Sequence, residues 1–216
     1  FGNGIATATQ AAMMLPLPTT LAGTTVKVID SAANESIAAL FFVSPTQLNY
    51  HLPPTVADGP ATVVTTTSDG SIFTESIRLA AASPGLFSVN ANGQGPAAAL
   101  LLRITAAGVQ RFEPVARFEQ ALGRWVTVPI EYGAGEQLFL VLFATGARNT
   151  SLQGASVTVG GVTNGVNLTF IGAQGDLIGV DQVNVTLPPT LAGRGEVDVV
   201  LTIGTQASNA VKINFK

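Results

Sequence analysis

An eleven-residue phrase that occurs twice constrains the fold of this 216-residue chain more than any other feature. Gln47–Ala57 reads QLNYHLPPTVA and Gln182–Ala192 reads QVNVTLPPTLA, so seven of the eleven positions are identical. Self-similarity of this kind is typical of a structural unit that is present twice. The alternation of apolar and polar residues predicts a β-strand in each copy. The Pro-Pro pair ends that strand, because proline cannot donate a backbone hydrogen bond to a central ladder.

The period-2 rule assigns faces within the phrase. Leu48, Tyr50 and Leu52 are expected to face the core, as are their counterparts in the second copy, which are Val183, Val185 and Leu187. His51, the only histidine, is then expected on the outer face, where Thr186 replaces it in the second copy.

The similarity between the two halves continues on both sides of the phrase. Residues 20–28 resemble 151–159, and residues 59–65 resemble 195–201. Further upstream, however, Phe1–Ile5 matches only the end of the apolar segment 136–147. We therefore expect the first copy to lack most of its opening strand, which would leave an unpaired sheet edge. The expected assembly edge consists of Phe1, Gly2, Asn3, Gly4 and Ile5.

Glycine, proline, threonine and valine are abundant, and short alternating runs recur about every ten residues, which predicts antiparallel β-structure. The only helical candidate, 112–122, contains Pro114. The chain is therefore predicted to be all-β, with a first sandwich at 1–82, a β-rich connector at 83–129 and a second sandwich at 130–216. The connector either supplies the missing strand of the first sandwich or bridges the two sandwiches. Within the first sandwich, we expect residues 37–43 to form a single strand.

Composition excludes several classes of function. The chain has 11% charged residues and a mean hydropathy of +0.42, yet no apolar run long enough for a membrane helix. A net charge of -3 with few lysines does not suit a nucleic-acid partner. Without cysteine there are no disulfides, thiol nucleophiles or zinc-thiolate sites. Because the sequence begins with Phe1 and not Met, we expect a mature fragment of an exported precursor.

Isolated residues that could carry chemistry have simpler structural explanations. His51 would have to anchor any Ser-His-Asp triad, but its outward position favours a solvent-facing role. Four acidic residues could supply oxygen ligands to Ca²⁺, but they do not form a known calcium-loop motif. These residues are Asp176, Asp181, Glu196 and Asp198. We predict no catalytic residue, no cofactor and no metal.

Aromatic and lysine side chains leave two further possibilities. Tyr50, Trp125 and Tyr132 could stack on sugars, although core packing is the simpler interpretation. Lys27 and Lys212 could form an intramolecular isopeptide bond, which needs a buried lysine beside a carboxylic acid. Lys27 is expected on the face opposite the apolar one.

Six ordered motifs resemble the C-terminal domain of similar length carried by large secreted proteins of Solibacter-type acidobacteria. They are Ser44–Asn49, Ser83–Phe87, Gly93–Ala97, Ala144–Asn149, Gly179–Asn184 and Leu191–Gly195. Each half also resembles an IPT/TIG immunoglobulin-like module, notably in Val157–Gly161 and Ser208–Val211. The resemblance implies two immunoglobulin-like β-sandwiches related by internal duplication and an exported surface or adhesion role. It implies no activity.

These observations predict a non-enzymatic extracellular or cell-surface protein. We expect it to self-associate into a filament or surface layer, with an extended segment of one subunit completing a sheet of its neighbour. The alternative is an adhesion module that binds polysaccharide or cell wall. Neither nucleic-acid binding nor membrane insertion is expected.

Overall fold

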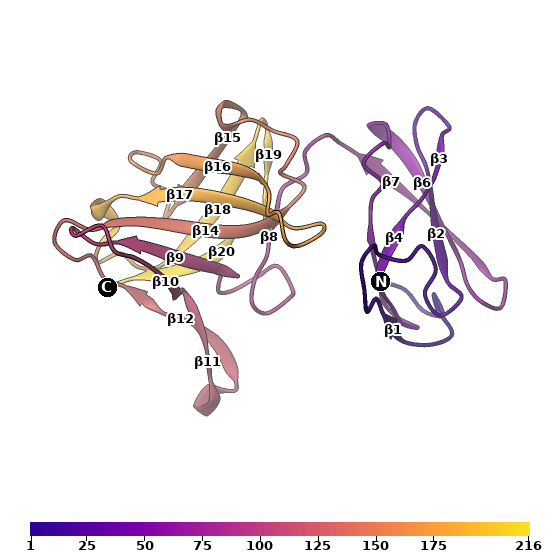
Figure 1. Cartoon of the computed structure of the whole chain (residues 1–216), viewed down its shortest axis with the longest axis horizontal. Helices are drawn as coiled ribbons and strands as arrows, with labels where there is room; N and C mark the ends of the chain where they lie inside the picture. Colours follow the sequence, from indigo (N-terminus) through magenta and orange to yellow (C-terminus); the bar gives the residue numbers. More distant parts are fainter. The chain divides into compact units, whose positions relative to one another are not determined.

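The computed structural model describes all residues, Phe1–Lys216, and confirms the all-β prediction (Figure 1). Its only helices are single 3-10 turns, η1 (Gln120–Leu122), η2 (Leu152–Gly154) and η3 (Pro189–Leu191). None of these turns has the length or apolar character that crossing a bilayer requires. The chain divides into two compact units, unit 1 (Phe1–Ala80) and unit 2 (Ala81–Lys216).

Unit 1 consists of two antiparallel sheets. The first has the order β1-β4-β5, formed by β1 (Gln10–Ala11), β4 (Ala39–Val43) and β5 (Leu48–His51). The second has the order β3-β2-β6-β7, formed by β3 (Glu35–Ile37), β2 (Thr25–Ile29), β6 (Gly59–Thr66) and β7 (Ile72–Leu79). Alternate residues of both sheets fill one core, which includes Val26, Val28, Leu40 and Val63. This arrangement is sandwich-like.

The prediction of one strand across residues 37–43 is wrong. β3 ends at Ile37 and pairs with β2, whereas β4 begins at Ala39 and pairs with β5 in the other sheet. Ala38, fully buried between them, donates its N–H to the carbonyl of Val26 (2.8 Å). The sequence pattern cannot reveal this change of sheet, because the apolar run continues without a break from Ile37 through Ala38 into β4.

Unit 2 also contains two main sheets. One has the order β10-β9-β14-β17-β16, with β8 paired beside β14, and the other has the order β13-β20-β18-β15, with β19 paired to β18. The bounds in the first sheet are β8 (Gly85–Leu86), β9 (Ala99–Ile104), β10 (Gln110–Pro114), β14 (Gln137–Thr145), β16 (Leu168–Ala173) and β17 (Asp181–Leu187). Those in the second are β13 (Pro129–Ile130), β15 (Ala155–Val159), β18 (Gly195–Ile203), β19 (Gln206–Ala207) and β20 (Val211–Phe215).

Two further strands, β11 (Ala116–Glu119) and β12 (Arg124–Thr127), pair only with each other. Figure 1 shows this hairpin projecting from the two main sheets of unit 2.

Residues 83–129 do not form the separate connector that we predicted. The structure places them in unit 2, where β9 pairs with β14 on one side and β10 on the other. Leu101 and Val115 from this segment lie in the same core as Leu140 and Val185. The apolar residues of 97–105 therefore belong largely to a central strand, β9, which is paired on both edges and whose Leu101 packs in the core.

Candidate strand-docking site

The two copies of the repeated phrase form β5 and β17, but the two strands have different neighbours. β17 pairs with β16 on one side and along its whole length with β14 on the other, from Leu138↔Leu187 to Ala144↔Asp181. β5 pairs with β4 only. Just before β5, Gly2 donates its N–H to the carbonyl of Thr46 (3.1 Å), and Ile5 donates to that of Pro45 (3.3 Å). Apart from these two bonds near its start, the edge of β5 that faces away from β4 has no partner strand.

Core-facing residues of the two strands differ in burial accordingly. Val183 and Val185 are fully buried, whereas their counterparts Leu48 and Tyr50 are half-buried. Leu187 is 4% exposed and its counterpart Leu52 is 39% exposed. In unit 2 the buried Leu138, Leu140 and Leu142 of β14 share the core with β17. The predicted inward face is therefore present in both copies, but in unit 1 it stays partly open.

A groove of about 320 Å³ lies at this open edge, between β5 and β7. Val63 and Thr65 of β6 are buried beneath it, with exposed fractions of 6% and 9%. The lining consists of Phe1, Gly2, Asn3, Ile5, Leu48, Tyr50, Val63, Thr65, Phe73, Thr74 and Glu75. A groove that has both apolar and polar lining and lies between two sheet edges can receive an extended strand, which supplies backbone hydrogen bonds and buries alternate side chains.

Tyr50 and Glu75 are the titratable side chains of the groove. Burial raises the pKa of the Tyr50 phenol, and the negative charge of Glu75 adds to this effect. The phenol therefore stays neutral over the physiological range and can act as a hydrogen-bond donor. Glu75 is exposed and makes no ion pair.

Four of the five residues predicted as an assembly edge line the groove, and the fifth, Gly4, turns the chain with φ of 70°. No sequence motif pointed to Phe73 or Glu75. β7 begins at Ile72, and pairing of Thr65 with Phe73 and of Val63 with Glu75 places them on the groove side. The Ile-Phe-Thr segment before Ser76 was the available signal, since β-branched and aromatic residues favour strands.

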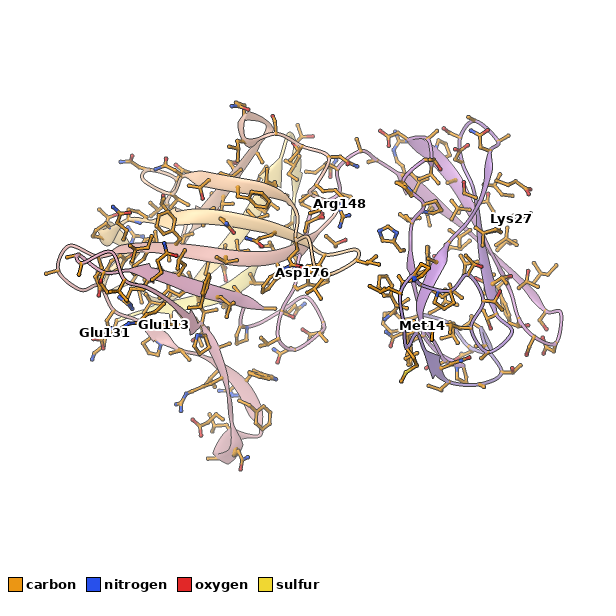
Figure 2. The ribbon with its side chains drawn as sticks, viewed as in Figure 1. Met14, Lys27, Glu113, Glu131, Arg148 and Asp176 are labelled. Atoms are coloured by element: carbon orange, nitrogen blue, oxygen red, sulfur yellow. The ribbon has the colours of Figure 1, made fainter.

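Other candidate residues take part in structural contacts. The ring of His51 lies edge-on to Phe41, with centroids 6.4 Å apart. Asp181 is fully buried, and its carboxylate pairs with Nε of Arg148 at 2.5 Å. Figure 2 labels Arg148 and, separately, Asp176. Asp198 pairs with Lys212 at 3.0 Å. Nowhere do three or more His, Asp or Glu side chains come together in a way that could hold a metal ion.

The remaining acidic, aromatic and lysine candidates lie apart from the groove, except Tyr50. Glu196 accepts a hydrogen bond from the Thr127 hydroxyl (3.0 Å). Tyr132 stacks on Phe215 and donates its hydroxyl to the carbonyl of Pro188 (2.8 Å). Trp125 lies on the projecting hairpin. Lys27 is partly exposed and pairs with Glu35 at 3.0 Å, so the buried geometry that an isopeptide bond needs is not present there.

Comparisons with protein-family models, with curated proteins and with solved structures found no match to this chain.

Proposed function

We propose that this chain is a non-enzymatic structural protein that self-associates by strand sharing, in which an extended segment of one copy lies along β5 of another. The observation that carries the proposal is the open edge of β5 beside a groove in which Leu48 and Tyr50 are half-buried. Unpaired backbone N–H and C=O groups at a sheet edge are a template for another strand. The incoming strand would occupy the position that β14 has beside β17.

We further propose that the two units derive from one immunoglobulin-like sandwich by duplication. Equivalent strand pairs support this. The pair β4–β5 corresponds to β16–β17, the pair β2–β6 corresponds to β15–β18, and the pair β6–β7 corresponds to β18–β20. The repeated phrase lies at the same place in both sets. Under this proposal, the open edge beside β5 is specific to the first copy, because the equivalent strand β17 is paired with β14.

The mode of assembly that we propose is an open filament or a surface layer outside the cell. A contact in which a groove on one copy receives a different segment of the next copy is heterologous, and such contacts propagate unless rotation closes a ring. The low charged fraction, 11%, and the resemblance of the sequence motifs to exported surface domains support an extracellular or cell-surface location.

The test is the oligomeric state of the full chain at increasing concentration, measured by size-exclusion chromatography with light scattering and by negative-stain electron microscopy. Leu48→Lys places a charge in the groove and should weaken association about tenfold or more, since a buried unpaired charge is costly. Asn49→Lys is the matched control, because Asn49 is the exposed neighbour on the same strand. Circular dichroism checks that both variants fold. A wild-type chain that stays monomeric at millimolar concentration would refute self-association.

A second candidate function is adhesion to polysaccharide, and exposed aromatic residues favour it. Trp125 is 37% exposed and Phe118 is 50% exposed, and aromatic faces can stack on sugar rings. Retention of the chain on insoluble glycans, with loss of retention in Trp125→Ala, is the expected result. Tyr132, for which the sequence left stacking as a possibility beside core packing, packs against the core of unit 2 and is less suited to this role.

A further inference from the structure

The β11–β12 hairpin is an unpartnered element with an apolar face. Its register pairs Ala116 with Thr127 and Phe118 with Trp125, so these four side chains share one face. The rings of Phe118 and Trp125 meet edge to face, with centroids 5.7 Å apart. Gly123 turns the tip in the left-handed region, with φ of 60°. The two strands pair only with each other, which leaves both outer edges of the hairpin unpaired.

Exposed aromatic residues on a projecting arm suit an interface better than the surface of an isolated domain. Phe118 is 50% exposed, Trp125 is 37% exposed, and Leu122 at the tip is 57% exposed. Binding hot spots are enriched in Trp, Tyr and Arg, which anchor in pockets that exclude water. The hairpin carries Trp125 and two arginines, and the groove beside β5 carries Tyr50.

The outer strands of the hairpin match β5 in length. β5, β11 and β12 each span four residues, so an outer hairpin strand can pair with the whole of β5. The opposite face of the hairpin carries Arg117, Arg124 and a single acid, Glu119. Arg117 pairs with Glu119 at 2.9 Å, which leaves Arg124 without an ion pair. With the aromatic face turned toward the groove, Arg124 lies on the same outer side as the exposed Asn49 of β5.

We propose that the β11–β12 hairpin of one copy docks on the groove beside β5 of a second copy. This inference rests on the proposed self-association and names the segment that is shared. An outer strand of the hairpin extends the β1-β4-β5 sheet, and the Phe118–Trp125 pair covers the half-buried Leu48 and Tyr50. The hairpin thereby takes the place beside β5 that β14 has beside β17.

The first test compares two aromatic variants of the full chain with wild type by light scattering across a concentration series. Phe118→Ser with Trp125→Ser should weaken association about tenfold or more, the loss typical of an anchor residue. Phe112→Ser is the matched control, because Phe112 is 62% exposed on β10, outside the hairpin, and should leave association unchanged. Thermal unfolding of each variant checks that the core is intact.

A cross-linking experiment tests the placement of the hairpin directly, and the absence of cysteine from the natural sequence makes it specific. One preparation carries Asn49→Cys and the other carries Arg124→Cys, and the two are mixed with a short thiol-reactive cross-linker. A covalent product that joins the two kinds of copy is expected. Ser156→Cys, exposed on β15, replaces the hairpin cysteine as the control and should give no such product.

The outcomes separate this inference from the proposed function. If Leu48→Lys prevents association but the double hairpin variant associates like wild type, another segment is shared and the hairpin inference is overturned. If the hairpin variant loses retention on glycans while association is unchanged, the aromatic face serves polysaccharide and the inference is again overturned. If the wild-type chain never associates, both proposals fail.

Discussion

Asp181 shows how one buried residue fixes the start of a strand. Its carboxylate accepts hydrogen bonds from the backbone N–H groups of Ala147 (2.7 Å) and Arg148 (3.1 Å) and pairs with the guanidinium of Arg148. These bonds join the turn after β14 to the start of β17. The counterpart of Asp181 in the first copy is Thr46, whose carbonyl accepts the N–H of Gly2.

We expect Asp181→Asn to lower the free energy of unfolding of unit 2 by about 2–3 kcal/mol. Removing one partner of a fully buried pair costs more than this, but Arg148 is about one-third exposed and partly solvated. Chemical denaturation measures the change. Asp198→Asn, at an exposed pair with Lys212, should change the same quantity by less than about 0.5 kcal/mol. Equal effects of the two substitutions would contradict the role given to Asp181.

Asp30 makes the stability of unit 1 depend on pH. Its carboxylate accepts the N–H groups of Ala57, Ala32 and Asn34, each at 2.9 Å, and these bonds, that of Ala57 foremost, lower its pKa. Because the pKa is lower in the folded chain than in the unfolded one, the stabilisation is present above about pH 4, the usual pKa of Asp. It is lost as the pH falls from there through the lower, folded value.

Asp30→Asn should therefore flatten the decline in the melting temperature of unit 1 below about pH 4. Thermal unfolding of wild type and variant between neutral and acidic pH measures this decline. Asp58→Asn, an exposed neighbour, should behave like wild type. If the melting temperature of Asp30→Asn falls with pH as steeply as that of wild type, other carboxylates determine the loss of stability of unit 1 in acid.

At the scale of the element, β5 and β17 carry the two copies of the repeated phrase in different surroundings, and a matched pair of substitutions measures the difference. Leu187→Ala should destabilise unit 2 by about 2–5 kcal/mol, because it leaves a cavity in a closed core. Leu52→Ala should cost unit 1 less than about 1.5 kcal/mol, because Leu52 is already 39% exposed. Denaturant titration at low protein concentration, where copies are dissociated, gives both values. If the two substitutions lower the free energy of unfolding by similar amounts, the edge of β5 is not open in the isolated chain.

At the scale of the whole molecule, the two units have separate cores of unequal size. Chains with more than one such core commonly depart from two-state unfolding. We expect differential scanning calorimetry to resolve two transitions. Asp181→Asn should lower only the transition of unit 2, and Asp30→Asn at neutral pH only that of unit 1. A single transition that both substitutions shift equally would show that the units unfold together.

The alternation of apolar residues was enough to predict the all-β class and the inward faces of Leu48 and Val183. Such periodicity reports which side of a strand meets the core, and that depends on nearest neighbours in sequence. The connector at 83–129 was assigned wrongly for a related reason: alternation shows that a segment is a strand but not which strand it pairs with. The pairing of β9 with β14 joins residues more than thirty positions apart.

The sequence by itself determined that two copies of a phrase exist and which residues of each copy face inward. Only the tertiary structure decided what this means physically. It brought Phe73 and Glu75 of β7 opposite Leu48 and Tyr50 of β5, and so formed a groove from segments that no local pattern links. It also left Phe118 and Trp125 uncovered on a hairpin. Burial is a property of the packed chain, because the same apolar residue is core or surface depending on which distant strand lies over it.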